Sequence, residues 1–260
     1  MSAQPNCHAD LANALAQARQ SAVAVGTVPA ATLPRDLTAA YALQREVAEL
    51  LGEVRGWKVS ALTPVQQQAM GVPRPVGGPL LAPWVHGAKA TLELSSFIAP
   101  KLECEYAFEL EHDLPERAQA YSRDEVLAAV RALRIGVEIT DTRLPPASPF
   151  LAELSDSFNN GAYLVGPSCS DWQHIDFSEH DIVLRADGRE IARGNARPIL
   201  NGDPLAAVVM LANAQPPGYG GLRAGHVVTT GTCTGAVPLP GACTVDADFG
   251  TLGHITMTLV

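Results

Sequence analysis

The spacing of apolar residues divides the chain into a helical beginning and a β-rich remainder. One helix is predicted over residues 10–23. A second helix starts near Asp36, whose side chain suits a helix N-cap, and ends at Gly52. Beyond it, short apolar runs broken by Gly and Pro dominate, which is typical of a rolled sheet or sandwich. We therefore expect an α+β fold with a helical N-terminal region at 1–53 and a β-rich core at 54–260.

The periodicity and the capping residues also predict individual elements of the core. A run with four prolines and two adjacent glycines indicates a loop, whereas Ser122 followed by Glu125 indicates a capping box at the start of a helix. We expect strands at 55–62, 101–110 and 134–143, helices at 64–70, 124–134 and 204–213, a hairpin at 181–194 with its turn at Asp187-Gly188, and a loop at 72–83.

The predicted strand KLECEYAFEL, residues 101–110, carries an unusual number of glutamates on one face. With a period of two, its apolar residues share one face, and Glu103, Glu105 and Glu109 share the other. Like charges on one strand face reduce stability. Such a face is either solvated, or two of its carboxylates bind a cation. The Cα atoms of Glu103 and Glu105 would lie roughly 6.5–7 Å apart, so both could reach one hard ion such as Mg²⁺ or Mn²⁺.

Three more polar residues interrupt apolar segments. Glu138 lies within the strand pattern IGVEIT, where a glutamate is costly unless it faces solvent or has a partner. It is therefore either an exposed edge residue or a third carboxylate of a metal site. Lys58 follows Trp57 in an apolar strand and is either a surface lysine or a buried group for proton transfer. Asp156 lies in a polar loop, where it either forms a turn or serves the site.

Composition narrows the classes of partner. The net charge of −9, without a run of Lys or Arg, argues against nucleic acid and against an anionic membrane. An acidic protein that binds a small acid needs a local cation. Five cysteines without metal-ligand spacing argue against zinc and against a disulfide framework. The sequence shows neither a signal peptide nor an apolar run long enough to span a membrane, so we expect a cytoplasmic protein.

The order of several segments resembles a known family. The chain is similar to the 2-keto-4-pentenoate hydratase/4-oxalocrotonate decarboxylase family, within the fumarylacetoacetate hydrolase superfamily. The resemblance covers about residues 38–260 and rests on the ordered set rather than on one motif. The segments are GWKVSALT, QQQAMGV with PVGGPL, PKLECEYAFEL, GVEITDTR, SDSFNNGAYLVG, NGDPLAAVVMLAN and TTGTCTGAVPLPGACTVDADFGTLG.

This resemblance implies a fumarylacetoacetate hydrolase-type core, a bound Mg²⁺ or Mn²⁺, a 2-oxo acid substrate from aromatic meta-cleavage pathways and a homo-oligomer. It matches Glu103, Glu105 and Glu138 to the metal ligands of the family. It matches Lys58 to the family's lysine in the pattern G-x-K-x-G-L-T-S and Asp156 to the aspartate in A-D-N-A-S. These two residues are the candidates for proton transfer or for orienting substrate and water.

The resemblance implies a metal-dependent lyase acting on a short 2-oxo acid. The leading hypothesis is a hydratase that converts 2-hydroxypenta-2,4-dienoate (2-keto-4-pentenoate) to 4-hydroxy-2-oxopentanoate. The alternatives are a 4-oxalocrotonate (2-oxo-3-hexenedioate) decarboxylase, an acylpyruvate-type C–C hydrolase and a non-catalytic subunit of a lyase complex. Val76 and the segment TGAVPLPG favour the decarboxylase branch. Two departures from the family pattern alter the expected pocket, namely Pro64 in place of a serine and Phe158 in place of an alanine.

Overall fold

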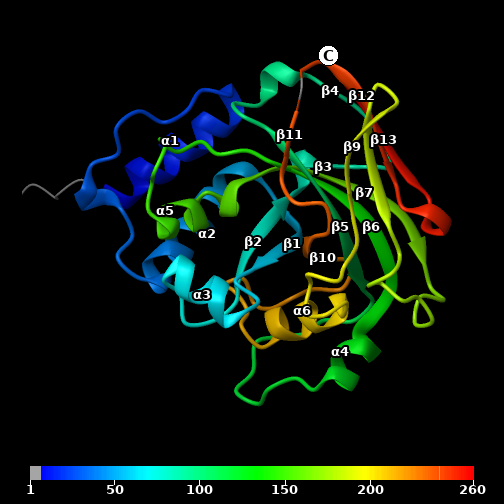
Figure 1. Cartoon of the computed structure of the whole chain (residues 1–260). Helices are drawn as coiled ribbons and strands as arrows, with labels where there is room; N and C mark the ends of the chain where they lie inside the picture. The colour runs from blue at the N-terminus through cyan, green and yellow to red at the C-terminus, as the bar shows by residue number, and fades with distance from the viewer. Residues whose placement is uncertain (1–6, 240) are drawn as a thin grey trace, which may run out of the picture.

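The chain folds into two β-sheets with a group of helices at one side (Figure 1). The structure is a computed structural model and describes residues 7–239 and 241–260. Within them, an eight-stranded mixed sheet has the order β2-β1-β10-β5-β6-β7-β3, with β11 paired to β5. Its strands are β1 (Val54–Ser60), β2 (Val76–Leu81), β3 (Val85–His86), β5 (Lys101–Leu110), β6 (Val130–Thr140), β7 (Asn160–Cys169), β10 (Val227–Thr232) and β11 (Val237–Pro238).

The second sheet has five strands in the described residues, in the order β4-β13-β12-β8-β9. They are β4 (Lys89–Leu92), β8 (Ile182–Ala186), β9 (Arg189–Gly194), β12 (Cys243–Asp248) and β13 (His254–Leu259). The predicted hairpin is confirmed as β8 and β9. Its turn residues Asp187 and Gly188 have φ angles of 48° and 75°, as a two-residue hairpin loop requires.

The main core lies between the two sheets. The apolar face of β5, which includes Tyr106 and Phe108, packs in one cluster with Leu184 of β8 and Met257 of β13. This confirms the apolar face that the period-two pattern predicts for 101–110. The glutamates of β5 consequently lie on the side of the large sheet that faces away from the second sheet.

The N-terminal helices pack beside the large sheet at β2. The helices are α1 (Cys7–Ser21) and α2 (Leu37–Leu51), and Asp36 caps α2 by accepting a hydrogen bond from the backbone of Ala39, as predicted. Figure 1 shows both helices beside α5 (Phe150–Ser155), on the side opposite the second sheet. Leu15 of α1 and Leu81 of β2 belong to the same apolar cluster. The described residues before Val54 contain no strand, while the expected boundary between residues 53 and 54 stays a prediction.

Two shorter helices follow the predicted caps. The helix α3 (Pro64–Met70) starts with a capping box at Thr63 and ends at Gly71 in the left-handed region. The helix α6 (Pro204–Ala212) follows Asp203, whose side chain caps it. No helix in the described part of the chain is long and apolar enough to cross a membrane.

The predicted loop at 72–83 is wrong, because β2 occupies half of it. Residues Val76–Leu81 pair antiparallel with β1, and all six are buried. The prolines of this segment indicated a loop. However, β2 lies at the edge of the sheet and pairs with a strand on one side only, where a proline is tolerated. Pro79 sits opposite Trp57 in this pair.

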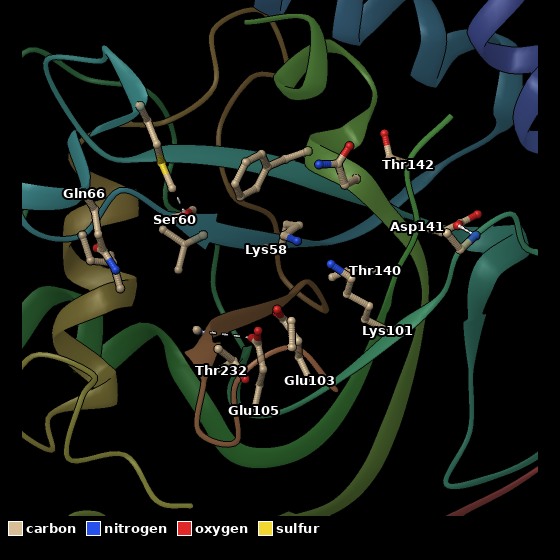
Figure 2. Close-up of a pocket in the computed structure, with 18 residues that line it drawn as sticks. Lys58, Ser60, Gln66, Lys101, Glu103, Glu105, Thr140, Asp141, Thr142 and Thr232 are labelled. Atoms are coloured by element: carbon tan, nitrogen blue, oxygen red, sulfur yellow. Dashed lines mark hydrogen bonds between the residues drawn. The ribbon is translucent and has the colours of Figure 1, made fainter. Parts of the chain in front are cut away.

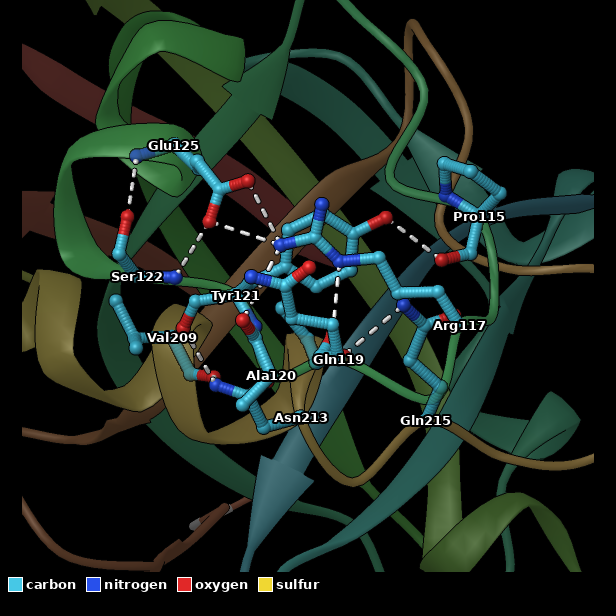
Figure 3. A network of polar contacts seen from close by, with 11 residues as sticks. Pro115, Arg117, Gln119, Ala120, Tyr121, Ser122, Glu125, Val209, Asn213 and Gln215 are labelled. Atoms are coloured by element: carbon cyan, nitrogen blue, oxygen red, sulfur yellow. Dashed lines mark hydrogen bonds and ion pairs between the residues drawn. The ribbon is translucent and has the colours of Figure 1, made fainter.

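The predicted helix at 124–134 is correct only in its first half. The helix α4 (Arg123–Ala129) starts with the expected capping box, in which the side chain of Ser122 accepts from the backbone of Glu125, and Arg117 contacts the Glu125 carboxylate at 2.8 Å (Figure 3). The helical pattern then gives way to β6 at Val130. Leu133 pairs with Phe108 and is buried in the core, so long-range pairing with β5 outweighs the local helical periodicity.

Candidate metal centre

Three glutamates from two neighbouring strands meet on the face of the large sheet that the second sheet leaves free. Glu103 of β5 lies directly opposite Glu138 of β6 in the antiparallel register, and Glu105 lies opposite Gly136. One carboxylate oxygen of each glutamate lies within 4.8 Å of the corresponding oxygens of the other two. Figure 2 shows Glu103 and Glu105 pointing the same way from β5. The structure therefore brings together the three residues that the sequence analysis proposed as metal ligands.

Burial and repulsion by neighbouring carboxylates make Glu103 and Glu105 hard to ionise without a cation. Glu105 is 2% exposed. Burial, followed by the charges of Glu138 and Glu103, raises the pKa of Glu105 to about 8. Burial and the charge of Glu138 likewise raise the pKa of Glu103 to about 7. The backbone N–H of Gly231 donates to Glu105 at 3.2 Å, which orients one of its oxygens.

Glu138 offers one oxygen to the protein and keeps the other unpaired. Its Oε1 accepts from the Lys58 ammonium at 2.8 Å and from the Asn160 amide at 2.9 Å. Its Oε2 is buried and has no hydrogen-bond partner among the described residues. A buried oxygen without a partner is costly. The donors present, carboxylate oxygens with one of them unpaired, fit a hard divalent cation.

Lys58 completes the charged cluster from β1. Its side chain is buried, pairs with Glu138 and lies 4.7 Å from the centre of the Phe158 ring. Burial alone would lower the pKa of Lys58, but the charges of Glu138 and Glu103 outweigh burial, and the pKa is raised. The group is therefore an ammonium ion that can donate hydrogen bonds at neutral pH.

A cavity of about 380 Å³ opens next to this cluster. Its lining includes Lys58, Lys101, Glu103 and Glu105 (Figure 2). Phe158 lines it as well. Glu138 contacts Lys58 but lies outside the described lining. The cavity is large enough for a small organic acid, and its lining combines carboxylates with two lysines.

Comparison with known proteins assigns the family. No family model matches the chain. A 2-keto-4-pentenoate hydratase of Burkholderia vietnamiensis is 30% identical over 258 residues, covering 97% of each chain. The chain belongs to the 2-keto-4-pentenoate hydratase/4-oxalocrotonate decarboxylase family. The resemblance drawn from the ordered segments is therefore confirmed.

Solved structures show the same fold. The 4-oxalocrotonate decarboxylase from Pseudomonas putida G7, complexed with magnesium and adipate, matches with a TM-score of 0.86 at 21% identity and covers 100% of this chain and 99% of its own. A fumarylpyruvate hydrolase from Pseudomonas aeruginosa, in complex with Mn²⁺ and pyruvate, matches with a TM-score of 0.54 at 18% identity, covering 79% and 89%. The expected α+β fold of the fumarylacetoacetate hydrolase type is confirmed.

Asp156, matched to the family's aspartate, is placed apart from the cavity. It follows α5, lies outside the described lining and pairs with Arg143, whose Nε is 2.9 Å from its Oδ2. Both side chains are 1% exposed. Burial raises the pKa of Asp156, and the charge of Arg143 opposes this rise. The backbone N–H of Arg143 also donates to the Asp156 carboxylate. The buried ion pair of Asp156 and Arg143 fixes the backbone at the start of the turn formed by residues 157–159.

That turn supplies Phe158, which the sequence analysis expected to alter the pocket, and Asn159, which it did not assign. Ser157, Phe158 and Asn159 all have positive φ angles, between 51° and 59°, which is strained for residues other than glycine. Phe158 and Asn159 line the cavity. A Cβ atom on Gly78 of β2 would lie 2.5 Å from the Ser157 carbonyl oxygen, so glycine is required for this close approach. The departure from the family pattern at Phe158 was the only signal in the sequence that pointed here.

Proposed function

We propose that the chain is a Mg²⁺- or Mn²⁺-dependent hydro-lyase that converts 2-hydroxypenta-2,4-dienoate to 4-hydroxy-2-oxopentanoate. The observation that carries the proposal is the convergence of three glutamates, two of them buried and one with an unpaired oxygen, beside an acid-sized cavity. The named hydratase among its relatives supports the substrate class. Related folds bound to magnesium with adipate and to Mn²⁺ with pyruvate support a metal that acts with a small acid.

Each residue of the site has a proposed part. Glu103, Glu105 and Glu138 would hold the cation. The cation would supply positive charge beside the C2 oxygen and the C1 carboxylate of the substrate. Lys58 lines the cavity, and its ammonium lies 4.7 Å from the centre of the Phe158 ring, which lines the cavity as well.

The reaction requires proton movements at several carbon atoms. Ketonisation removes the proton of the C2 hydroxyl and delivers one to C5. Hydration then adds a hydroxyl group to C4 and a proton to C3. Lys58 is the proposed group that gives and recovers a proton, because it lines the cavity next to the carboxylates. Asp156, which the cavity does not reach, is proposed to position the strained turn through Arg143 rather than to contact substrate.

One observation favours the decarboxylase as a second candidate. Lys101 lines the cavity and has no ion-pair partner among the described residues. It could pair with the second carboxylate of 2-oxo-3-hexenedioate, which the five-carbon dienoate lacks. The likeness to a decarboxylase structure concerns the fold alone and does not choose between the two reactions. Val76, which favoured this branch in the sequence, is buried in β2 and lies outside the described lining.

A side-by-side assay separates these reactions. The protein is stripped of metal, reloaded with Mg²⁺ or Mn²⁺, and supplied in turn with 2-hydroxypenta-2,4-dienoate, 2-oxo-3-hexenedioate and an acylpyruvate. Metal-dependent loss of dienoate absorbance with formation of 4-hydroxy-2-oxopentanoate supports the proposal. Release of CO₂ identifies the decarboxylase, and release of pyruvate from the acylpyruvate identifies a hydrolase. If metal binds but all three substrates persist, the chain is a non-catalytic subunit.

A further inference from the structure

Arg19 in α1 is a buried cation, and its burial should reduce the stability of the fold rather than increase it. Its side chain is 5% exposed, and in the described part of the chain no carboxylate lies within ion-pair distance of it. It donates to neutral oxygens, those of the Asn160 side chain at 3.1 Å and the Gly161 backbone at 3.0 Å. Its guanidinium lies 4.3 Å from the centre of the Trp84 ring. Burying a charge without a carboxylate is costly.

Arg19 fixes the orientation of the Asn160 side chain. An asparagine amide has a donating end and an accepting end, whereas a guanidinium only donates. The contact with Arg19 therefore requires that Oδ1 of Asn160 face Arg19. The Nδ2 end then points to Glu138 and donates to its Oε1 at 2.9 Å. Without Arg19 the amide could turn, and its Oδ1 would then face the Glu138 carboxylate.

Two donors act on the same oxygen of Glu138. Lys58 and Asn160 both donate to Oε1, at 2.8 and 2.9 Å, and Oε2 has no partner among the described residues. The two hydrogen bonds hold the plane of the carboxylate and leave Oε2 without a protein donor. Lys58 comes from β1 and Asn160 from β7, while the anchor of Asn160 comes from the N-terminal helix.

We infer that Arg19 is a positioning residue of the metal centre, which through Asn160 fixes Glu138 so that Oε2 is the oxygen offered to the cation. The inference rests on the proposed metal dependence. It assigns a role in the site to a helix that precedes the β-rich core. Removing a group that orients a metal ligand typically weakens metal binding by about 10–100-fold.

The test measures Mn²⁺ affinity of the folded protein at one pH, by the electron paramagnetic resonance signal of free Mn²⁺. Arg19→Met is expected to raise the Kd for Mn²⁺ at least about tenfold. The melting temperature of Arg19→Met without metal should not fall in proportion to the loss of Mn²⁺ affinity, because the substitution also removes a buried charge that has no carboxylate partner. Arg19→Lys, which keeps one charged donor, should recover part of the affinity.

A double-mutant cycle tests the route through Asn160. Asn160→Ala alone should weaken Mn²⁺ binding to a similar extent, and it reports on the same link if Arg19→Met does not fold. Adding Arg19→Met to Asn160→Ala should cause no further loss, since both changes break one chain of contacts. The matched control is Leu15→Ala, a buried residue of the same helix that packs in the apolar cluster. It should lower the melting temperature and leave the Kd unchanged.

The outcomes distinguish this inference from the proposed function. If the unmodified protein does not bind Mn²⁺, the metal centre itself is refuted. If it binds Mn²⁺ and Arg19→Met binds equally well, only the role of Arg19 is overturned. If the losses of the two single variants add in the double variant, Arg19 does not act through Asn160. If Leu15→Ala weakens binding as much as Arg19→Met, the effect is one of helix packing and the inference fails.

Discussion

Replacing Glu105 by glutamine should change stability in opposite directions with and without metal. Glutamine keeps the shape of the side chain and an oxygen that can accept from Gly231, but it removes one of three clustered negative charges. Without metal, the folded protein must either protonate Glu105, whose pKa is about 8, or hold a repelled buried carboxylate. The metal-free variant should therefore be more stable than the unmodified protein at pH 8.

The loss of metal-induced stabilisation can be worked out from linkage. A metal concentration of about 100 times Kd stabilises the native state by about 2.7 kcal/mol. In a chain of this size that corresponds to a rise in melting temperature of about 5–10 °C. If the variant binds about 100-fold more weakly, the same concentration supplies only about 0.4 kcal/mol, or a rise of about 1 °C.

Thermal unfolding of both proteins at pH 8, with a chelator and then with Mg²⁺, checks this result. The matched control is Glu109→Gln, on the same face of β5 but outside the described cavity lining and paired with Arg134 at 2.6 Å. The control should keep the full response to Mg²⁺. A Glu105→Gln variant that responds to Mg²⁺ as strongly as the control would refute the carboxylate centre. A lower metal-free melting temperature would show that Glu105 has a stabilising role that does not depend on metal.

Three further predictions concern pH, the pocket wall and the buried ion pair. Without metal, the pKa values of Glu103 and Glu105 in the folded protein are about 7 and about 8, well above the ordinary value of 4.5. The folded state therefore binds more protons than the unfolded state, and the free energy of unfolding should fall as pH rises from 5 to 8. A thermal stability that does not change over this pH range would contradict this. Phe158→Ala should enlarge the cavity and raise kcat/KM for the homologue one methyl group longer, relative to the five-carbon substrate, by about tenfold. Asp156→Asn should destabilise the fold by about 3–5 kcal/mol in urea unfolding, because it leaves Arg143 buried without its carboxylate, and the Kd for Mn²⁺ should stay unchanged.

Two patterns in the sequence indicated the three candidate metal ligands. Glu103 and Glu105 share a strand face by periodicity, and Glu138 interrupts an apolar strand. Periodicity does not give the register between strands, so the residues alone left open whether Glu138 joins Glu103 and Glu105, and the resemblance to a family favoured that alternative. The pairing of Glu103 with Glu138 across β5 and β6 is the long-range fact that the structure adds.

Residues that support the site through long-range contacts do not stand out from any local pattern in the sequence. Arg19 and Asn160 are 141 positions apart, and an arginine on a helix is ordinary in sequence. The same limit explains the two wrong elements. The strand β2 and the start of β6 at Val130 are stabilised by pairing with β1 and β5, which outweighs a proline-rich composition and a helical periodicity.

The charges around the cavity explain how an acidic protein can receive an acid. Three clustered carboxylates and the ammonium of Lys58 leave two negative charges, which one divalent cation cancels. Burial and the neighbouring carboxylates raise the pKa values of Glu103 and Glu105, so without metal protons partly take that place at neutral pH. Metal binding must then release protons, so metal affinity should increase with pH. Once the cluster is neutral, Lys101 remains as a positive charge in the cavity lining and would attract the carboxylate of the proposed substrate despite the net charge of −9.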